Sequence, residues 1–72
     1  MARDEVAITD GTIRLGQFLK LAGLIDSGAD AKAVIANGLV SVNDEVERRR
    51  GRKLRVGDEV SIAGRTAVIT NG

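Results

Sequence analysis

The spacing of apolar residues changes at Gly38, and this change limits the chain to a fold with two kinds of layer. Before Gly38 the apolar residues recur with the period of a helix, as in the set Leu15, Phe18, Leu19 and Ala22. After Gly38 they alternate with polar residues, as in Val40-Ser41-Val42, which is the period of a strand with one buried face. The sequence therefore predicts an α+β fold in which the helices come early and most of the sheet follows.

Two helices are predicted in the first half of the chain. The first begins after Thr12, whose hydroxyl suits an N-cap, and ends near Gly23. The second is opened by Ser27, with Asp30 three residues later in a capping-box-like pattern, and Gly38 can end it by adopting positive φ. The link between them is short, which predicts two helices packed at an angle.

A short strand and a hairpin are predicted on either side of these helices. The strand covers residues 6–9 and is stopped by the turn-forming pair Asp10-Gly11. The hairpin covers residues 40–46 and reverses at Asn43-Asp44. Asparagine tolerates the left-handed conformation that a tight turn needs, whereas aspartate adopts it less easily than glycine does. The hairpin is therefore expected to begin the main sheet.

The remaining strands should complete a small, mainly antiparallel sheet. Leu54 and Val56 are both expected to point into the core from one strand. A last strand at residues 67–69 should pair back on residues 59–63. Neither a linker nor an internal repeat is visible, so residues 1–72 are expected to form a single domain.

Most of the positive charge lies in one short segment. Residues 48–55, Arg-Arg-Arg-Gly-Arg-Lys-Leu-Arg, contain six of the eleven basic residues and none of the ten acidic ones. We call these residues the basic segment. The rest of the chain has five basic and ten acidic residues, so a cationic segment is attached to an acidic body. Such a cluster can displace condensed counterions from a phosphate backbone, and the alternative is a solvated loop without a partner.

The composition leaves few groups for catalysis. Cysteine, histidine and tyrosine are absent, which excludes disulfides, thiolate chemistry and Cys-ligated metal centres. Asp44, Glu45 and Glu47 are close in sequence, but all three are expected to be exposed, so no metal site is predicted. No glycine pattern resembles a phosphate-binding loop. We therefore expect a protein that is not an enzyme, with no catalytic residues and no cofactor.

The longest uninterrupted apolar stretches of the chain are only a few residues long, which bears on its cellular location. They are too short for a membrane span, and the N-terminus lacks the apolar centre of an export signal. We therefore expect a cytoplasmic protein.

Several short motifs occur in an order that resembles a known domain. They are Ile13-Arg14-Leu15-Gly16-Gln17-Phe18-Leu19, Ser27-Gly28-Ala29-Asp30-Ala31-Lys32, the hairpin that includes Asn43, and Val56-Gly57-Asp58-Glu59-Val60. Their order and spacing are similar to the S-four RNA-binding domain, the αL motif named after small-subunit ribosomal protein four. The small free-standing bacterial members of that family resemble the chain most closely. The core of the resemblance covers about residues 12–63.

The resemblance implies two helices packed on a small sheet, with RNA bound by the helices and the first hairpin. It gives a contact role to Arg14 on the first helix, Lys32 on the second and Asn43 at the hairpin turn. The basic segment follows that hairpin, where basic residues are common in the free-standing members. The candidate RNA-binding residues are Arg14, Lys32, Asn43, Arg48, Arg49, Arg50, Arg52, Lys53 and Arg55.

The chain departs from the family pattern at three places. Gly28-Ala29-Asp30 stand where many members have basic residues, which should shift phosphate binding toward the hairpin. Gly16 replaces a usual aspartate and could allow a backbone to approach closely. Asp44 replaces the usual turn glycine and adds a negative charge next to the expected RNA surface.

These observations predict a non-catalytic, monomeric protein that binds structured RNA, either ribosomal RNA or ribosome-bound tRNA, and that associates with the ribosome. Phe18 is the only aromatic residue, so strong sequence discrimination by base stacking is not expected. Two alternatives stay open. The basic segment could dock on an acidic protein partner, or it could bind duplex DNA, although the second helix offers few side chains that read bases.

Overall fold

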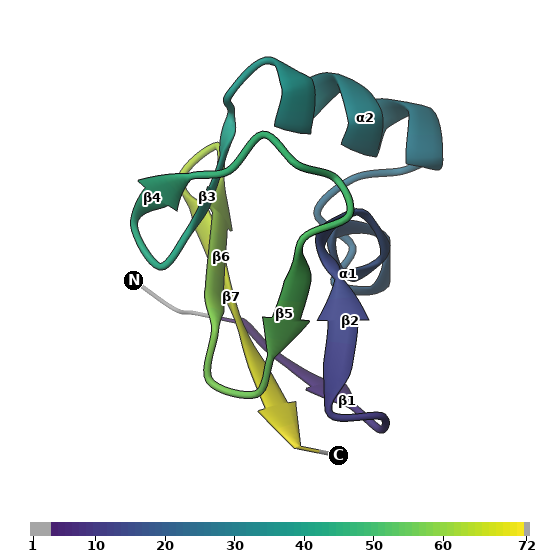
Figure 1. The fold of residues 1–72 in the computed structure, drawn as a ribbon, viewed down its shortest axis with the longest axis vertical. Helices are drawn as coiled ribbons and strands as arrows, with labels where there is room; N and C mark the ends of the chain where they lie inside the picture. The colour runs from purple at the N-terminus through teal and green to yellow at the C-terminus, as the bar shows by residue number, and fades with distance from the viewer. Residues whose placement is uncertain (1–3, 72) are drawn as a thin grey trace.

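The structure, a computed structural model, describes residues 4–71 and places two helices over one face of a five-stranded sheet (Figure 1). The elements are β1 (Asp4–Ile8), β2 (Thr12–Arg14), α1 (Leu15–Leu21), α2 (Gly28–Ala36), β3 (Val40–Val42), β4 (Glu45–Val46), β5 (Lys53–Arg55), β6 (Glu59–Ile62) and β7 (Arg65–Asn71). Neither helix is long and apolar enough to cross a membrane. The α+β class predicted from the sequence is confirmed.

The main sheet has the strand order β1-β7-β6-β3-β4. Its strands pair antiparallel except for β1, which lies parallel to β7 at one edge. The predicted return of the last strand onto residues 59–63 is confirmed, with Val60 opposite Ala67. The strand predicted at residues 6–9 is thus part of this sheet, and its neighbour is the last strand of the chain.

The β3–β4 hairpin forms as the sequence predicts. Val42 pairs with Glu45, so Asn43 and Asp44 make a two-residue turn. Their φ angles are 51° and 70°, and positive φ at both central residues is the requirement of a type I′ turn. The aspartate therefore adopts the left-handed conformation that the usual glycine would supply.

The start of α1 differs from the prediction. Thr12 is not an N-cap, because Thr12–Arg14 form strand β2, which pairs antiparallel with β5 in a separate two-stranded sheet. We call this pair the β2–β5 ribbon. The helix begins at Leu15, and its N-cap residue, Arg14, makes no side-chain capping bond. The cap predicted for the second helix is correct, since the Asp30 N–H donates to Ser27 Oγ over 3.2 Å.

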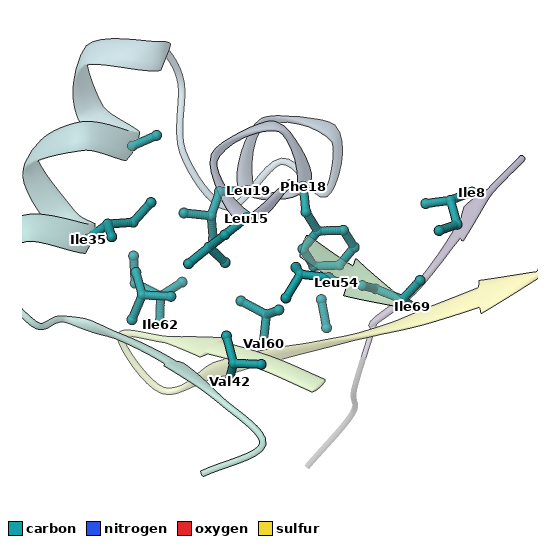
Figure 2. Close-up of a cluster of buried hydrophobic side chains, with 13 residues drawn as sticks. Ile8, Leu15, Phe18, Leu19, Ile35, Val42, Leu54, Val60, Ile62 and Ile69 are labelled. Atoms are coloured by element: carbon teal, nitrogen blue, oxygen red, sulfur yellow. The ribbon is translucent and has the colours of Figure 1, made fainter. Parts of the chain in front are cut away.

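The core lies between the helices and the main sheet and is aliphatic apart from Phe18 (Figure 2). Leu15, Phe18 and Leu19 point down from α1 toward side chains of the sheet, and Leu54 reaches the same cluster from the ribbon. Burial of this surface is the main favourable contribution to folding in a chain of this size.

Val56 does not join that core, contrary to the prediction. Leu54 is fully buried, whereas Val56 is 46% exposed. Strand β5 ends at Arg55, and the chain then turns through Gly57, whose φ is +98°. The alternation of inward and outward side chains stops where the strand stops, so Val56 loses the inward direction.

Leu54→Ala and Val56→Ala should therefore differ strongly in stability. Replacing the buried leucine should lower the free energy of unfolding by about 2–5 kcal/mol, because a cavity remains in the core. Replacing the exposed valine should cost less than about 1 kcal/mol. Urea denaturation of both variants checks this, and equal losses would contradict the different burial of the two side chains.

Candidate nucleic-acid interface

The basic segment connects the hairpin to the start of α1. Figure 1 shows the chain after β4 running below α2 and entering β5 beside β2. On this path the Arg52 carbonyl accepts the Leu15 N–H over 2.9 Å, and the Arg50 carbonyl accepts the Gly16 N–H over 3.1 Å. The first N–H groups of a helix have no partner inside it, so these two carbonyls cap α1 in place of a side chain.

Gly16 lies under this segment, but the atoms that approach it most closely belong to a side chain and not to the backbone that the sequence led us to expect. A Cβ added at Gly16 would lie 2.8 Å from Cγ of Arg50, closer than carbon atoms can pack. The helix therefore carries glycine, at some cost in helix propensity, where the basic segment lies against it.

Arg48 contacts the other helix. Its Nη1 donates to the Ala36 carbonyl at the C-terminal end of α2 over 3.4 Å, and its guanidinium lies against Gly38. A helix C-terminus carries partial negative charge, so a cation is favourable there. The basic segment thus touches the end of α2 and the start of α1.

Glu47 precedes the basic segment and is buried, only 6% exposed, although the sequence led us to expect an exposed side chain. Its carboxylate accepts Arg49 Nε at 3.1 Å, Arg49 Nη2 at 3.2 Å and Arg52 Nη1 at 2.8 Å. The Arg49 N–H also donates to it over 3.0 Å. The prediction failed because strand alternation does not report the two guanidinium groups that follow β4 and compensate the charge of the buried carboxylate.

These bonds lower the pKa of Glu47 from 4.5 to about 2. The hydrogen bonds from Arg49 contribute most and those from Arg52 come next, and together they outweigh the opposing effect of burial. Glu47 is therefore ionised at neutral pH and offsets part of the charge of the segment.

The β2–β5 ribbon gathers cations on one face. Arg14 lies directly opposite Lys53, and Thr12 lies opposite Arg55, while the Ile13–Leu54 pair faces inward. Strand alternation places the side chains of Arg14, Lys53 and Arg55 on the outer face, where all three are exposed.

Within residues 4–71, no acidic side chain forms an ion pair with the cations of this face. Arg14 Nη1 donates to the Gly51 carbonyl over 3.2 Å, which orients the guanidinium without removing its charge. Within residues 4–71, no carboxylate forms an ion pair with Arg14, Arg50, Lys53 or Arg55. Like charges directly opposite each other are unfavourable in a sheet, so the Arg14–Lys53 pair favours a bound anion.

The other two predicted contact residues lie elsewhere. Lys32 is exposed on α2. Asn43 uses its amide inside the protein: Nδ2 donates to Asp58 Oδ1 over 3.1 Å, and Oδ1 accepts the Glu59 N–H over 3.0 Å. These bonds hold the hairpin turn against residues 58 and 59 at the start of β6. A role for Asn43 in RNA binding stays a prediction.

The nine predicted residues therefore have different positions. Arg49 and Arg52 pair with Glu47, and Arg48 donates to the end of α2. Arg14, Arg50, Lys53 and Arg55 are exposed and pair with no carboxylate within residues 4–71, and we call these four residues the cationic face. The residue that the sequence reasoning missed is Glu47. An acidic residue immediately before a run of arginines was the one available signal for it.

The fold and this face define a small α+β domain with a cationic surface built around the start of its first helix. The sequence profile of the family described as the S4 domain matches residues 6–70. The chain therefore belongs to the S4 domain family, as its motifs predicted.

Two relatives cover most of the chain. A protein of Bacillus subtilis (strain 168) named "Probable ribosome maturation protein RlbA" is 54% identical over 59 residues, which cover 82% of this chain and 83% of that protein. The protein YbcJ of Escherichia coli (strain K12) is 42% identical over 57 residues, which cover 79% of this chain and 81% of YbcJ.

Solved structures show the same fold. The solution structure of YbcJ from E. coli, described as having an αL motif involved in RNA-binding, superposes with a TM-score of 0.66 at 37% identity and covers 97% of this chain and 87% of its own. The crystal structure of the 30S ribosomal protein S4e from Thermoplasma acidophilum gives a TM-score of 0.61 at 26% identity. That match covers 81% of this chain and 31% of the S4e chain.

Gly16→Ala should destabilise the protein because the added methyl group pushes the basic segment away from α1. We expect a net loss of about 1 kcal/mol, since overpacking outweighs the gain in helix propensity. Gly28→Ala is the matched control, because a Cβ there meets no other atom within 4 Å. Thermal and urea unfolding measure both, and a Gly16→Ala variant as stable as the control would contradict the close packing.

The acid dependence of stability should include a contribution from Glu47. Its pKa is lowered on folding, so its stabilising effect is present above about pH 4.5 and is lost as the pH falls toward about 2. Glu47→Gln lacks this titration. The difference in unfolding free energy between wild type and variant should therefore shrink across that range, as urea denaturation at a series of pH values would show. A constant difference would contradict the ionised pair.

Proposed function

We propose that this protein binds structured RNA through the cationic face and the basic segment, without catalysing a reaction. The observation that carries the proposal is the exposed Arg14–Lys53 pair with Arg55 beside it, three cations on one face of the ribbon that form no ion pair within the described residues 4–71. Phosphate groups of a nucleic acid would relieve the repulsion among them.

Family membership and the names of the relatives support RNA over other polyanions. One relative is named for ribosome maturation, and the structure of another is described by a motif involved in RNA-binding. We therefore propose ribosomal RNA, or tRNA bound to the ribosome, as the target, and association with the ribosome as the setting. The protein would act in the cytoplasm, as a monomer, with residues 1–72 working as one domain.

The chemistry of the face favours recognition of RNA shape. Arginine presents a planar fork that can pair with two phosphate oxygens or stack on an exposed base. Phe18, the one aromatic side chain, is fully buried and cannot serve as a stacking platform. Contacts would thus go mainly to phosphates, which position a protein on RNA but carry little sequence information.

The double substitution Lys53→Ala with Arg55→Ala should weaken binding to a structured ribosomal RNA fragment by about tenfold or more at moderate salt. For four to six neutralised phosphates, the wild-type log–log salt slope should be about −3 to −5, and the double variant should reduce its magnitude by about 2. Fluorescence anisotropy titrations at several salt concentrations measure both quantities.

The control is Lys20→Ala with Arg65→Ala, which removes the same charge from exposed positions outside the cationic face. It should leave the slope nearly unchanged. Equal effects of the two double variants would mean that net charge, and not this face, determines binding. A salt slope near zero for the wild type would refute RNA binding, and a nuclease-resistant complex with an acidic protein would favour the alternative partner.

A further inference from the structure

Glu47 is the one buried charged side chain within residues 4–71, and it lies next to the most basic part of the chain. An acidic residue beside a nucleic-acid-binding segment normally opposes binding, because it repels phosphate. Its burial and its four hydrogen bonds therefore need a reason other than a contact with RNA.

The bonds of Glu47 hold the loop that carries the cations. Its carboxylate joins Arg49 and Arg52, and the Arg52 N–H closes a turn onto the Arg49 carbonyl over 3.2 Å. Arg50 lies between the two bonded arginines, and its carbonyl caps α1. The carboxylate thus links Arg49 to Arg52 across the loop, and the Gly16 N–H of α1 holds the Arg50 carbonyl between them.

Glu47 also orients Arg49. The pairing uses Nε and Nη2 of the guanidinium, so Nη1 has no partner within residues 4–71. The Arg49 side chain is nevertheless 77% exposed. One edge of the guanidinium is held by the protein, and the opposite edge is open to an oxygen ligand in solution.

We propose that Glu47 is a positioning residue for RNA binding: it holds Arg49 and Arg52 in a closed loop, and so presents Arg49 and Arg50 toward phosphates of the bound RNA. The proposal rests on the proposed function. A loop that is ordered before binding avoids the entropy cost of ordering long arginine side chains when RNA binds.

The proposal predicts that removing the charge of Glu47 lowers the affinity for RNA, whereas a charge effect alone would raise it. Glu47→Gln makes the protein one unit more positive, so a charge effect alone would tighten binding to RNA. If Glu47 positions the loop, the neutral amide forms weaker hydrogen bonds with the guanidinium groups of Arg49 and Arg52, and the affinity for RNA falls. Glu45→Gln is the matched control, because Glu45 is exposed on β4 and forms no ion pair within the described residues.

We expect Glu47→Gln to weaken binding to a structured ribosomal RNA fragment by about three- to tenfold, while Glu45→Gln binds as well as wild type or more tightly. Titrations are made below the temperature at which circular dichroism detects unfolding of any variant. In a background that carries Arg49→Ala and Arg52→Ala, Glu47→Gln should no longer weaken binding, because its two partners are gone. Tighter binding by both glutamine variants, or an unchanged loss in that background, would overturn the proposal.

Arg49→Lys tests the same idea without touching the buried carboxylate. Lysine keeps the charge but cannot pair through two nitrogens, so affinity should fall by about threefold or more. Arg65→Lys, an exposed site away from the loop, should leave affinity unchanged. If wild type binds RNA but Arg49→Lys binds equally well, positioning fails while the proposed function stands. If wild type does not bind RNA, the proposed function itself fails.

Discussion

Two hydrogen bonds at the start of α1 hold the cationic surface in place. They join the N–H groups of Leu15 and Gly16 to carbonyls of Arg52 and Arg50, far along the chain. A short helix without a side-chain cap needs such partners. Because carbonyls of the basic segment supply them, the same contacts that start the helix bring the segment against it, and its basic side chains stay exposed apart from the half-buried Arg52. The same two hydrogen bonds thus cap the helix and place the cations beside it.

In a small domain, repulsion among the six basic residues of the basic segment lowers the stability of the fold. The aliphatic core is modest, so every unfavourable charge contact is a sizeable share of stability. The protein offsets part of the charge with Glu47 and with the C-terminal end of α2, which receives Arg48. Among residues 4–71, no carboxylate offsets the charge of the Arg14–Lys53 pair in this way. This division separates cations whose charge is offset by Glu47 or a helix end from cations that pair with no carboxylate within residues 4–71, and it explains why an acidic residue belongs in a basic region.

The departures from the family pattern agree with this division. Gly28-Ala29-Asp30 give the start of α2 no positive charge, and Asp44 adds a negative charge at the hairpin tip. The cationic face lies instead on the β2–β5 ribbon and at Arg50. Gly16, which costs helix propensity, is explained by the approach of Arg50. The chain therefore keeps the S4 domain fold and places its cationic face around the start of α1.

The sequence by itself determined the features that depend on near neighbours. The change of apolar period separated helices from strands, Ser27 marked the start of α2, and Asn43-Asp44 marked the hairpin turn. The basic segment and its neighbour Arg14 were also visible as candidates. Only the tertiary structure decided that Thr12 joins a strand, that Val56 faces solvent and that Glu47 is buried. These outcomes depend on partners distant in the chain or beyond the end of a strand, and the energy of a buried carboxylate is set by the groups around it, which periodicity does not report.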